Sequence, residues 1–155
     1  MESSQIQETK FKTLFHISMV SRLMNRIARV IIKRGEEHDK TKLESPELDG
    51  FVEHTEKLSS LTYGSNEYKK ALDDLKPTLD HHYANNRHHP EHFKNGMTDM
   101  NLVDLVEMFC DWKTSSTRQN NGNIRQSLEV NAKRFDMSPQ LIKILENTID
   151  LFGEE

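Results

Sequence analysis

The stretch that decides the fold class runs from residue 101 to residue 117 and reads NLVDLVEMFCDWKTSST. Its apolar residues recur every three or four positions, the spacing that places side chains on one face of an α-helix. It lacks the strict alternation of apolar and polar residues that indicates a strand. The stretch therefore predicts an amphipathic helix, with a buried face formed by Leu102, Leu105, Val106 and Phe109.

Similar periodicity, broken by glycine and proline, continues on both sides of this stretch. Helices are expected over about 6–34, 36–43, 46–58 and 65–86, with a loop over 87–98 and two short helices within 123–155. The last helix is expected to be capped by Ser138 and Pro139. The sequence thus predicts an all-α protein, a compact bundle of about six to seven helices in a single domain over 1–155.

The composition excludes several classes of protein. The single cysteine, Cys110, rules out an internal disulfide and a four-cysteine zinc site. No apolar run approaches the roughly 20 residues that span a bilayer, and the first residues do not resemble a signal peptide. A net charge of -4 makes a general nucleic-acid binder unlikely on composition. We therefore expect a cytoplasmic protein without a membrane partner, while apolar positions in the terminal helices leave a homodimer open.

Two stripes follow the first expected helix. The first combines a histidine with aliphatic residues and is expected to face the core: His16, Val20, Leu23, Ile27 and Val30. The second is basic, and its simpler interpretation is a solvated face: Arg22, Arg26, Arg29 and Lys33. A contact to phosphate, a partner or nucleic acid is the alternative for the basic stripe.

The adjacent residues His38 and Asp39 give the most specific local signal of chemistry. They offer an imidazole nitrogen and a carboxylate oxygen, both ligands for divalent metals. Lys42 follows Asp39 by one helical turn, where its ammonium would meet a phosphate held by the metal. His16 lies one helix earlier, as expected if ligands converge from two antiparallel helices. A surface pair near a helix end is the alternative for His38 and Asp39.

Five of the eight histidines fall within residues 81–92, together with Asn86, Arg87 and Glu91. So many polar groups would make a poor core, and loops at helix ends are common places for metal and substrate sites. A metal or phosphate site is therefore predicted here, with a polar surface loop as the alternative. His81 and His92 are the expected bystanders.

The helix at 101–117 carries three acidic residues on one face, Asp104, Glu107 and Asp111. A solvent-facing stripe is expected for Asp104. Asp111 differs because Cys110 and Trp112 flank it with residues of buried type, so it is a candidate metal ligand.

The order of these residues resembles the H…HD…H…H…D order of the HD-domain superfamily of metal-dependent phosphohydrolases. Residues 38–42 are similar to the HD-x-G-K signature of the HD-GYP branch, with Thr41 in place of glycine, and residues 88–91 are similar to its HHE motif, with Pro90 inserted. No GYP tripeptide follows Gly96. A closer likeness is to small phage and bacterial proteins with HD-x-[ST]-K, N-x-HHPE and E-M-x-C-D-W segments. The resemblance covers roughly 16–118, and 123–155 add nothing to it.

The resemblance implies one or two divalent ions, from among Mn, Fe, Co, Mg, Ni and Zn. It implies the ligands His16, His38, Asp39, His82, His88, His89 and Asp111. Asn86, Glu91 and Glu107 are the expected groups behind the ligands, where they would orient imidazoles. The expected groups for substrate and turnover are Asp39, Lys42, Arg87 and Arg118.

The activity that the resemblance implies is hydrolysis of a small phosphate ester by a metal-activated water, with a nucleotide monoester as the first choice of substrate. A phosphodiesterase acting on a cyclic or linear nucleotide is one alternative. A non-catalytic metal-binding or interaction module is the other.

Overall fold

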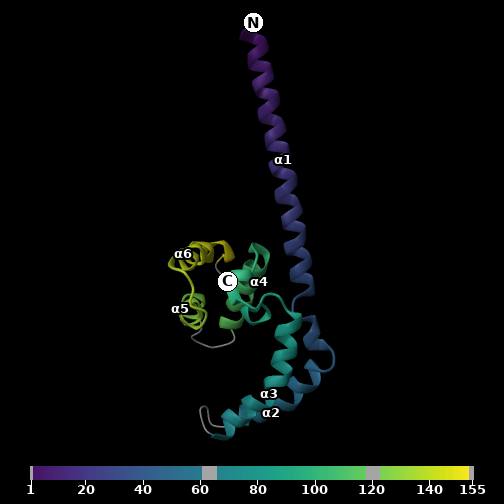
Figure 1. The fold of residues 1–155 in the computed structure, drawn as a ribbon, viewed down its shortest axis with the longest axis vertical. Helices are drawn as coiled ribbons and strands as arrows, with labels where there is room; N and C mark the ends of the chain where they lie inside the picture. The colour runs from purple at the N-terminus through teal and green to yellow at the C-terminus, as the bar shows by residue number, and fades with distance from the viewer. Residues whose placement is uncertain (1, 61–65, 118–122, 154–155) are drawn as a thin grey trace. The chain divides into compact units, whose positions relative to one another are not determined.

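The structure is a computed structural model that describes residues 2–60, 66–117 and 123–153 (Figure 1). Within these residues it contains six α-helices, four 3-10 turns and no strand, so the predicted all-α class is confirmed. The α-helices are α1 (Glu2–Glu37), α2 (Glu47–Ser60), α3 (Asn66–Asn85), α4 (Leu102–Ser116), α5 (Ile124–Arg134) and α6 (Pro139–Thr148). The 3-10 turns are η1 (Lys40–Leu43), η2 (Pro90–His92), η3 (Gly96–Asp99) and η4 (Ile149–Phe152).

The chain divides into two units, Met1–Glu36 and Glu37–Glu155, and each is described by itself. None of the described helices combines the length and hydropathy needed to cross a membrane.

The first unit consists of α1, which extends beyond the expected end at about residue 34. A break before Glu36 and a second helix over 36–43 were expected, but α1 continues through Gly35 to Glu37. The chain turns at Asp39, whose φ of 56° lies in the left-handed region that Asp tolerates better than most residues. A 3-10 turn, η1, takes the place of the second helix. The expected pair of antiparallel helices between residues 6 and 43 is therefore wrong.

The aliphatic stripe of α1 is exposed, contrary to the expected core-facing position. Val20 and Val30 are 41% and 47% exposed, and Leu23 and Ile27 are 58% and 51% exposed. A single helix has no interior in which its own side chains can be buried, so periodicity correctly located an apolar face but not its partner.

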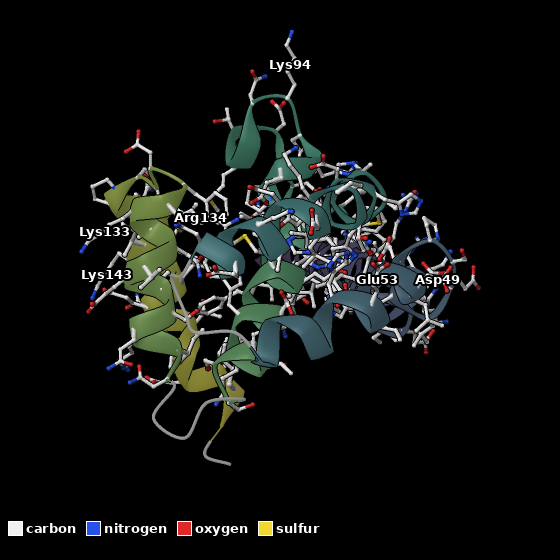
Figure 2. All side chains as sticks on the ribbon, turned by 90° about the horizontal axis from the view of Figure 1, so that it is seen from below. Asp49, Glu53, Lys94, Lys133, Arg134 and Lys143 are labelled. Carbon is white, nitrogen blue, oxygen red and sulfur yellow. The ribbon has the colours of Figure 1, made fainter. Side chains whose placement is uncertain are left out.

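The core of the second unit lies between α4, α5 and α6. Met108, Phe109 and Trp112 of α4 pack with apolar residues of the two following helices and their connections, Ile124, Leu128, Met137 and Leu145. The ring of Trp112 stacks on that of Phe135 at 6.2 Å between centroids. Charged side chains such as Lys133 and Lys143 project outward from α5 and α6 (Figure 2). The α5 and α6 caps, Asn123 and Ser138, accept backbone N–H groups as expected for helix starts.

α2 and α3 lie side by side (Figure 1). Gly50 of α2 faces Thr78 of α3 so closely that a Cβ at position 50 would clash with the threonine side chain. Glycine is needed here because the helices approach closely, not because of its backbone freedom.

α4 is rotated relative to the expected orientation. Phe109 is buried as predicted, but Leu102 and Val106 are 77% and 40% exposed, so those two predictions are wrong. Asp104, expected in solvent, is fully buried, where its carboxylate closes the N-terminal capping box with Asn101. With the core face displaced in this way, two other acidic residues of α4, Glu107 and Asp111, lie close to His38.

Candidate metal centre

Asp39 occupies the centre of a cluster of imidazoles and carboxylates. Its two carboxylate oxygens face different sets of neighbours, which come from η1, α3, the 86–89 turn and α4. All these elements belong to the second unit, Glu37–Glu155. Asp39 has a left-handed backbone and is the residue at which η1 begins.

Three histidines gather on the Oδ1 side of Asp39. The Nε2 atoms of His82 and His88 lie 3.4 and 3.5 Å from Asp39 Oδ1. His89 Nε2 lies 2.9 Å from His82 Nε2. One ligand atom from each of Asp39, His82, His88 and His89 falls within 4.8 Å of the others, a set of three imidazoles and one carboxylate that can hold one metal ion.

A second set gathers on the Oδ2 side. His38 Nε2 lies 3.5 Å from Asp39 Oδ2 and 3.8 Å from Asp111 Oδ1. These three residues also offer ligand atoms within 4.8 Å of one another. Asp39 belongs to both sets, through different oxygens, as a carboxylate that bridges two ions would.

Glu47, the first residue of α2, holds the imidazole of His82 from behind. Its side chain is fully buried, and Glu47 Oε2 lies 2.8 Å from His82 Nδ1. A carboxylate only accepts, so Nδ1 must donate, and the lone pair of the neutral ring is then on Nε2. Nε2 is the atom that faces Asp39. Glu47 therefore fixes the tautomer in which His82 binds a metal.

Glu107 of α4 has the same role for His38, whose Nδ1 hydrogen-bonds its carboxylate, and it also lies close to His88, whose Nδ1 makes no hydrogen bond within the described part of the chain. Its Oε1 lies 3.0 Å from His38 Nδ1 and 3.1 Å from His88 Nδ1. The Nε2 atoms of both rings face the carboxylate of Asp39. His38, His88 and Glu107 are close enough to form a third ligand set, but a carboxylate behind two Nδ1 atoms orients ligands in the manner of metalloproteins.

The residues present fit a cation chemically. Asp39 Oδ1 and His88 Nε2 are buried polar atoms without a hydrogen-bond partner in the structure. The two atoms lie 3.5 Å apart, and buried polar atoms are normally satisfied. A divalent cation bound between them would accept an electron pair from each and leave neither atom unsatisfied. Histidine nitrogen together with carboxylate oxygen suits Mn, Fe, Co, Ni and Zn better than Ca.

The pKa values of the histidines follow from these neighbours. Burial lowers the pKa of His82, against the raising effect of Glu47. Burial, with His88 and His82 alongside, lowers the pKa of His89 to about 3. Both rings are therefore neutral at neutral pH, the form that binds metals. The hydrogen bond to Glu107 raises the pKa of His38.

The carboxyl groups remain charged in spite of their burial. Burial alone would raise the pKa of Asp39, but the hydrogen bond and charge of Lys42 outweigh it, and the pKa lies below its usual value. The same balance holds for Glu47, whose pKa is lowered by hydrogen bonds from His81, His82 and Thr41.

Lys42 is the one predicted substrate-binding residue that the structure places at the cluster. Its Nζ lies 2.6 Å from Asp39 Oδ2 and 5.7 Å from the centre of the Phe51 ring. Its side chain is about one-third exposed, so the ammonium lies at the border between the ligand cluster and solvent.

Asn86 supports the cluster from the end of α3. Its Nδ2 donates to Thr41 Oγ1 at 2.8 Å and to the carbonyl of His82 at 2.9 Å. Thr41 in turn donates to Glu47. Asn86 Nδ2 also lies 3.0 Å from His82 Nδ1, so Asn86 lies behind that imidazole, and its role in orienting a ligand stays a prediction. His81 Nδ1 bonds Glu47 and His92 Nδ1 bonds the carbonyl of Tyr83, and neither histidine belongs to a ligand set found in the described residues.

Other predicted site residues lie elsewhere. Arg87 makes a two-pronged ion pair with the buried carboxylate of Asp104 and packs on Phe93, so its guanidinium is engaged in the fold. Glu91 accepts from Arg134 on α5 instead of supporting an imidazole, so that expectation is wrong. Arg118 lies outside the described residues.

His16 lies in the first unit and is not among the ligand sets found in the described residues. Its side chain is exposed, and twenty residues of unbroken helix, about 30 Å, separate it from Glu36. The assignment of His16 as a ligand remains a prediction of the resemblance.

Glu47 is the residue that sequence reasoning missed. An acidic residue in the first turn of a helix is expected for its favourable interaction with the helix dipole, so nothing singled it out. The available signal was the adjacent pair of His81 and His82, two imidazoles that need an acceptor.

These observations define the class: an all-α protein whose second unit carries a preformed cluster of histidines and carboxylates suited to divalent metals. The chain belongs to DUF5662, a family of unknown function, which matches it over residues 5–151. No curated protein and no solved structure matches the chain.

Proposed function

We propose that this protein is a metal-dependent phosphohydrolase that acts on a small phosphate ester, with a nucleotide monoester as the preferred substrate class. The single observation that carries the proposal is the position of Asp39 between two ligand sets, each reached by a different carboxylate oxygen. The resemblance of the motif order to HD-domain phosphohydrolases supports the same activity.

The proposed metal ligands are His82, His88 and His89 on one side and His38 and Asp111 on the other, with Asp39 shared. Bound divalent cations supply an activated water and stabilise charge on a transferring phosphoryl group. Glu47 and Glu107 hold the imidazoles of His82 and His38 with Nε2 directed at the proposed metal positions, so these two rings need little reorganisation when metal binds.

Lys42 supplies the substrate contact in this proposal. Its ammonium is partly exposed and adjacent to the shared carboxylate, where it can neutralise a phosphate that reaches the metals. In the structure the same ammonium bonds Asp39, the group that the metals would take. With metal and substrate bound, Lys42 would exchange its carboxylate partner for a phosphate.

The experiment that tests the proposal compares metal content and hydrolysis in the wild type and two variants. Purified protein is stripped with a chelator, reloaded with Mn²⁺, Co²⁺, Fe²⁺ or Mg²⁺, and assayed against phosphomonoesters, nucleotides and cyclic dinucleotides. Asp39→Asn keeps the left-handed backbone, because Asn also tolerates it, but removes the bridging charge. Asp49→Asn, at an exposed position on α2, is the matched control (Figure 2).

We expect hydrolysis by the reloaded wild type and the control and none by Asp39→Asn, which also loses metal. Hydrolysis that survives chelation, or an active Asp39→Asn protein, contradicts the proposal. A protein that binds two exchangeable metals but hydrolyses none of these esters would be a metal-binding module instead. Hydrolysis confined to the cyclic dinucleotides would identify a phosphodiesterase.

A further inference from the structure

The hydroxyl of Thr41 connects three elements of the second unit behind His82. Thr41 belongs to η1, and its Oγ1 donates to Glu47 Oε2 of α2 at 2.9 Å. The same Oγ1 accepts from Asn86 Nδ2, directly after the end of α3, at 2.8 Å. Glu47 Oε2 in turn lies 2.8 Å from His82 Nδ1. The four residues therefore form one hydrogen-bonded chain that ends on a proposed metal ligand.

The carboxylate of Glu47 fixes the direction of every hydrogen bond in this chain. An ionised carboxylate only accepts, so Thr41 must give its single proton to Glu47. The hydroxyl oxygen then accepts from Asn86, and only the nitrogen of an amide donates. The second proton of that nitrogen goes to the carbonyl of His82 at 2.9 Å. Both amide protons of Asn86 are therefore engaged.

Asn86 is also a competitor of Glu47 for His82. Asn86 Nδ2 lies 3.0 Å from His82 Nδ1, within hydrogen-bond distance. If the amide donated to Nδ1, that nitrogen would carry no proton of its own, and the neutral ring would be protonated on Nε2. Nε2 is the atom that faces Asp39, and a protonated nitrogen has no lone pair for a metal. The hydroxyl of Thr41 offers the amide proton another acceptor.

Burial gives this competition its effect. Glu47 is fully buried, and His82 and Asn86 are 2% and 8% exposed. A buried donor that loses its acceptor has no bulk water to replace it, and an unsatisfied donor is destabilising. Without the Thr41 hydroxyl, the freed proton of Asn86 would therefore turn to a nearby acceptor, and His82 Nδ1 is within reach.

We infer that Thr41 is a positioning residue that holds His82 in its metal-binding tautomer, by donating to Glu47 and accepting from Asn86. The inference rests on the proposed function in one respect, which is the role of His82 as a metal ligand. Thr41 itself is not in any ligand set found among the described residues, so it acts through its neighbours. A substitution that keeps the hydroxyl should preserve this role, and one that keeps only the shape should not.

The test measures the tautomer of His82 and the Zn²⁺ affinity of the full-length protein. Imidazole nitrogen NMR shifts of the metal-free protein at about pH 8, assigned with His82→Gln, distinguish a neutral ring protonated on Nδ1 from one protonated on Nε2. We expect Nδ1–H in the wild type and in Thr41→Ser. Thr41→Val should show a mixture with Nε2–H and bind Zn²⁺ about tenfold more weakly. Thr148→Val, which removes a hydroxyl that bonds a backbone carbonyl on α6, is the matched control and should equal the wild type.

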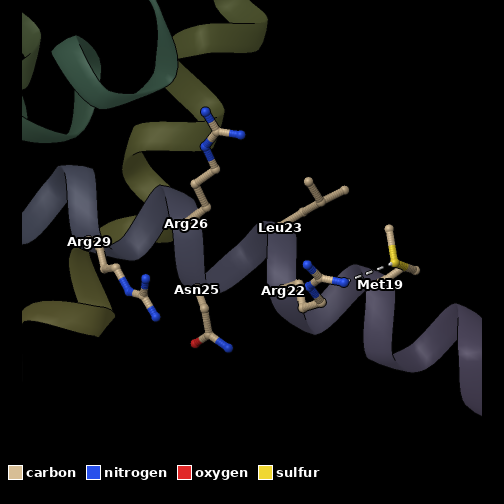
Figure 3. Close-up of a pocket in the computed structure, with 6 residues that line it drawn as sticks. All are labelled: Met19, Arg22, Leu23, Asn25, Arg26 and Arg29. Atoms are coloured by element: carbon tan, nitrogen blue, oxygen red, sulfur yellow. Dashed lines mark hydrogen bonds between the residues drawn. The ribbon is translucent and has the colours of Figure 1, made fainter.

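A double variant tests whether Asn86 is the competitor. Thr41→Val with Asn86→Ala lacks both the hydroxyl and the competing N–H, so His82 should return to Nδ1–H. Asn25→Ala makes the same asparagine substitution in a shallow surface pocket of α1, lined also by Arg22 and Arg26, and should change neither measurement (Figure 3). Far-ultraviolet circular dichroism verifies that each variant is folded.

Several results would overturn the inference. A wild-type His82 protonated on Nε2 does so without any variant. Thr41→Ala removes the same hydroxyl from a smaller side chain, and it takes the place of Thr41→Val if the valine protein does not fold. Unchanged nitrogen shifts in a folded protein without the hydroxyl, with or without a loss of Zn²⁺ affinity, would mean that the amide turns to Glu47 instead. A double variant that keeps Nε2–H excludes Asn86 as the competitor.

These measurements are independent of the proposed hydrolysis. None of them involves a phosphate ester, so a Thr41 hydroxyl without influence on His82 would leave the proposed hydrolysis intact. A protein that hydrolyses no ester could still show the expected tautomers and Zn²⁺ affinities.

Discussion

Glu47 Oε2 lies 2.8 Å from Nδ1 of His82, and both side chains are almost completely buried. The carboxylate also accepts from His81 and from Thr41, so one buried charge organises three donors from two other elements. Such second-layer carboxylates typically contribute 10–100-fold in metal affinity. Glu47→Gln should therefore weaken metal binding by about that factor, because the neutral amide presents a donor where His82 also donates.

The measurement is competition for Zn²⁺ or Co²⁺ with a chelating dye. Glu53→Gln is the matched control, since Glu53 is an exposed glutamate on the same helix (Figure 2). Equal affinities for the two variants would show that Glu47 serves only the fold. Circular dichroism and thermal unfolding establish that the variants compared are folded.

Substitution of Lys42 should have opposite effects on metal affinity and on substrate turnover. Its ammonium lies 2.6 Å from Asp39 Oδ2 and competes with any cation for that oxygen. Lys42→Gln should therefore raise metal affinity, by about tenfold, while it lowers turnover of a phosphate ester and raises KM. Lys40→Gln, at an exposed position two residues earlier, should change neither. Weaker metal binding by Lys42→Gln would mean that the lysine supports the cluster instead of competing with metal.

Most helices were predictable because their boundaries carry local signals. Ser138 caps α6 as expected, and the helices expected over 101–117 and 65–86 match Leu102–Ser116 and Asn66–Asn85. The cluster around Asp39 was also accessible to sequence reasoning, since imidazoles and carboxylates are identifiable as ligand types. Its supporting residues were not, because a buried Glu47 and a surface glutamate have the same local sequence features.

The errors share a physical cause, which is that pairing over long sequence separations has no local signature. Arg87 pairs with Asp104, seventeen residues on, and Glu91 pairs with Arg134, forty-three residues on. Each pair takes a charged residue out of the predicted site. The 3.6-residue period likewise located apolar faces on α1 and α4 but did not determine what covers them.

Arg87 is expected to stabilise the fold and not to bind phosphate. Removing its guanidinium takes the two-pronged ion pair away from the fully buried carboxylate of Asp104, so Arg87→Ala should lower the free energy of unfolding by about 1–3 kcal/mol. Arg134→Ala breaks a more exposed pair with Glu91 and should lower it by less than about 1 kcal/mol. Urea unfolding measures both, and metal affinity should be unchanged. Normal stability with lost phosphatase activity in Arg87→Ala would restore Arg87 as a phosphate-binding residue.

The apo protein should lose stability as the pH falls below about 6.5. Burial holds the pKa of His89 at about 3, while an unfolded histidine titrates near 6.5. Between these values the unfolded chain binds a proton that the folded chain does not, so acid favours unfolding. His82 acts in the same direction because its pKa is also lowered. The raised pKa of His38 opposes both, with stability that is lost as the pH rises.

The carboxyl groups do not reverse this trend. The pKa values of Asp39 and Glu47 are lowered, so their contributions to stability are lost only at still lower pH. Urea midpoints measured with a chelator at pH 7.5, 6.0 and 5.0 should fall in that order. His89→Asn removes the group with the largest shift and should flatten the dependence. A wild-type midpoint that stays constant or rises between pH 7.5 and 5.0 would mean that His89 is not buried as a neutral ring against His82 and His88.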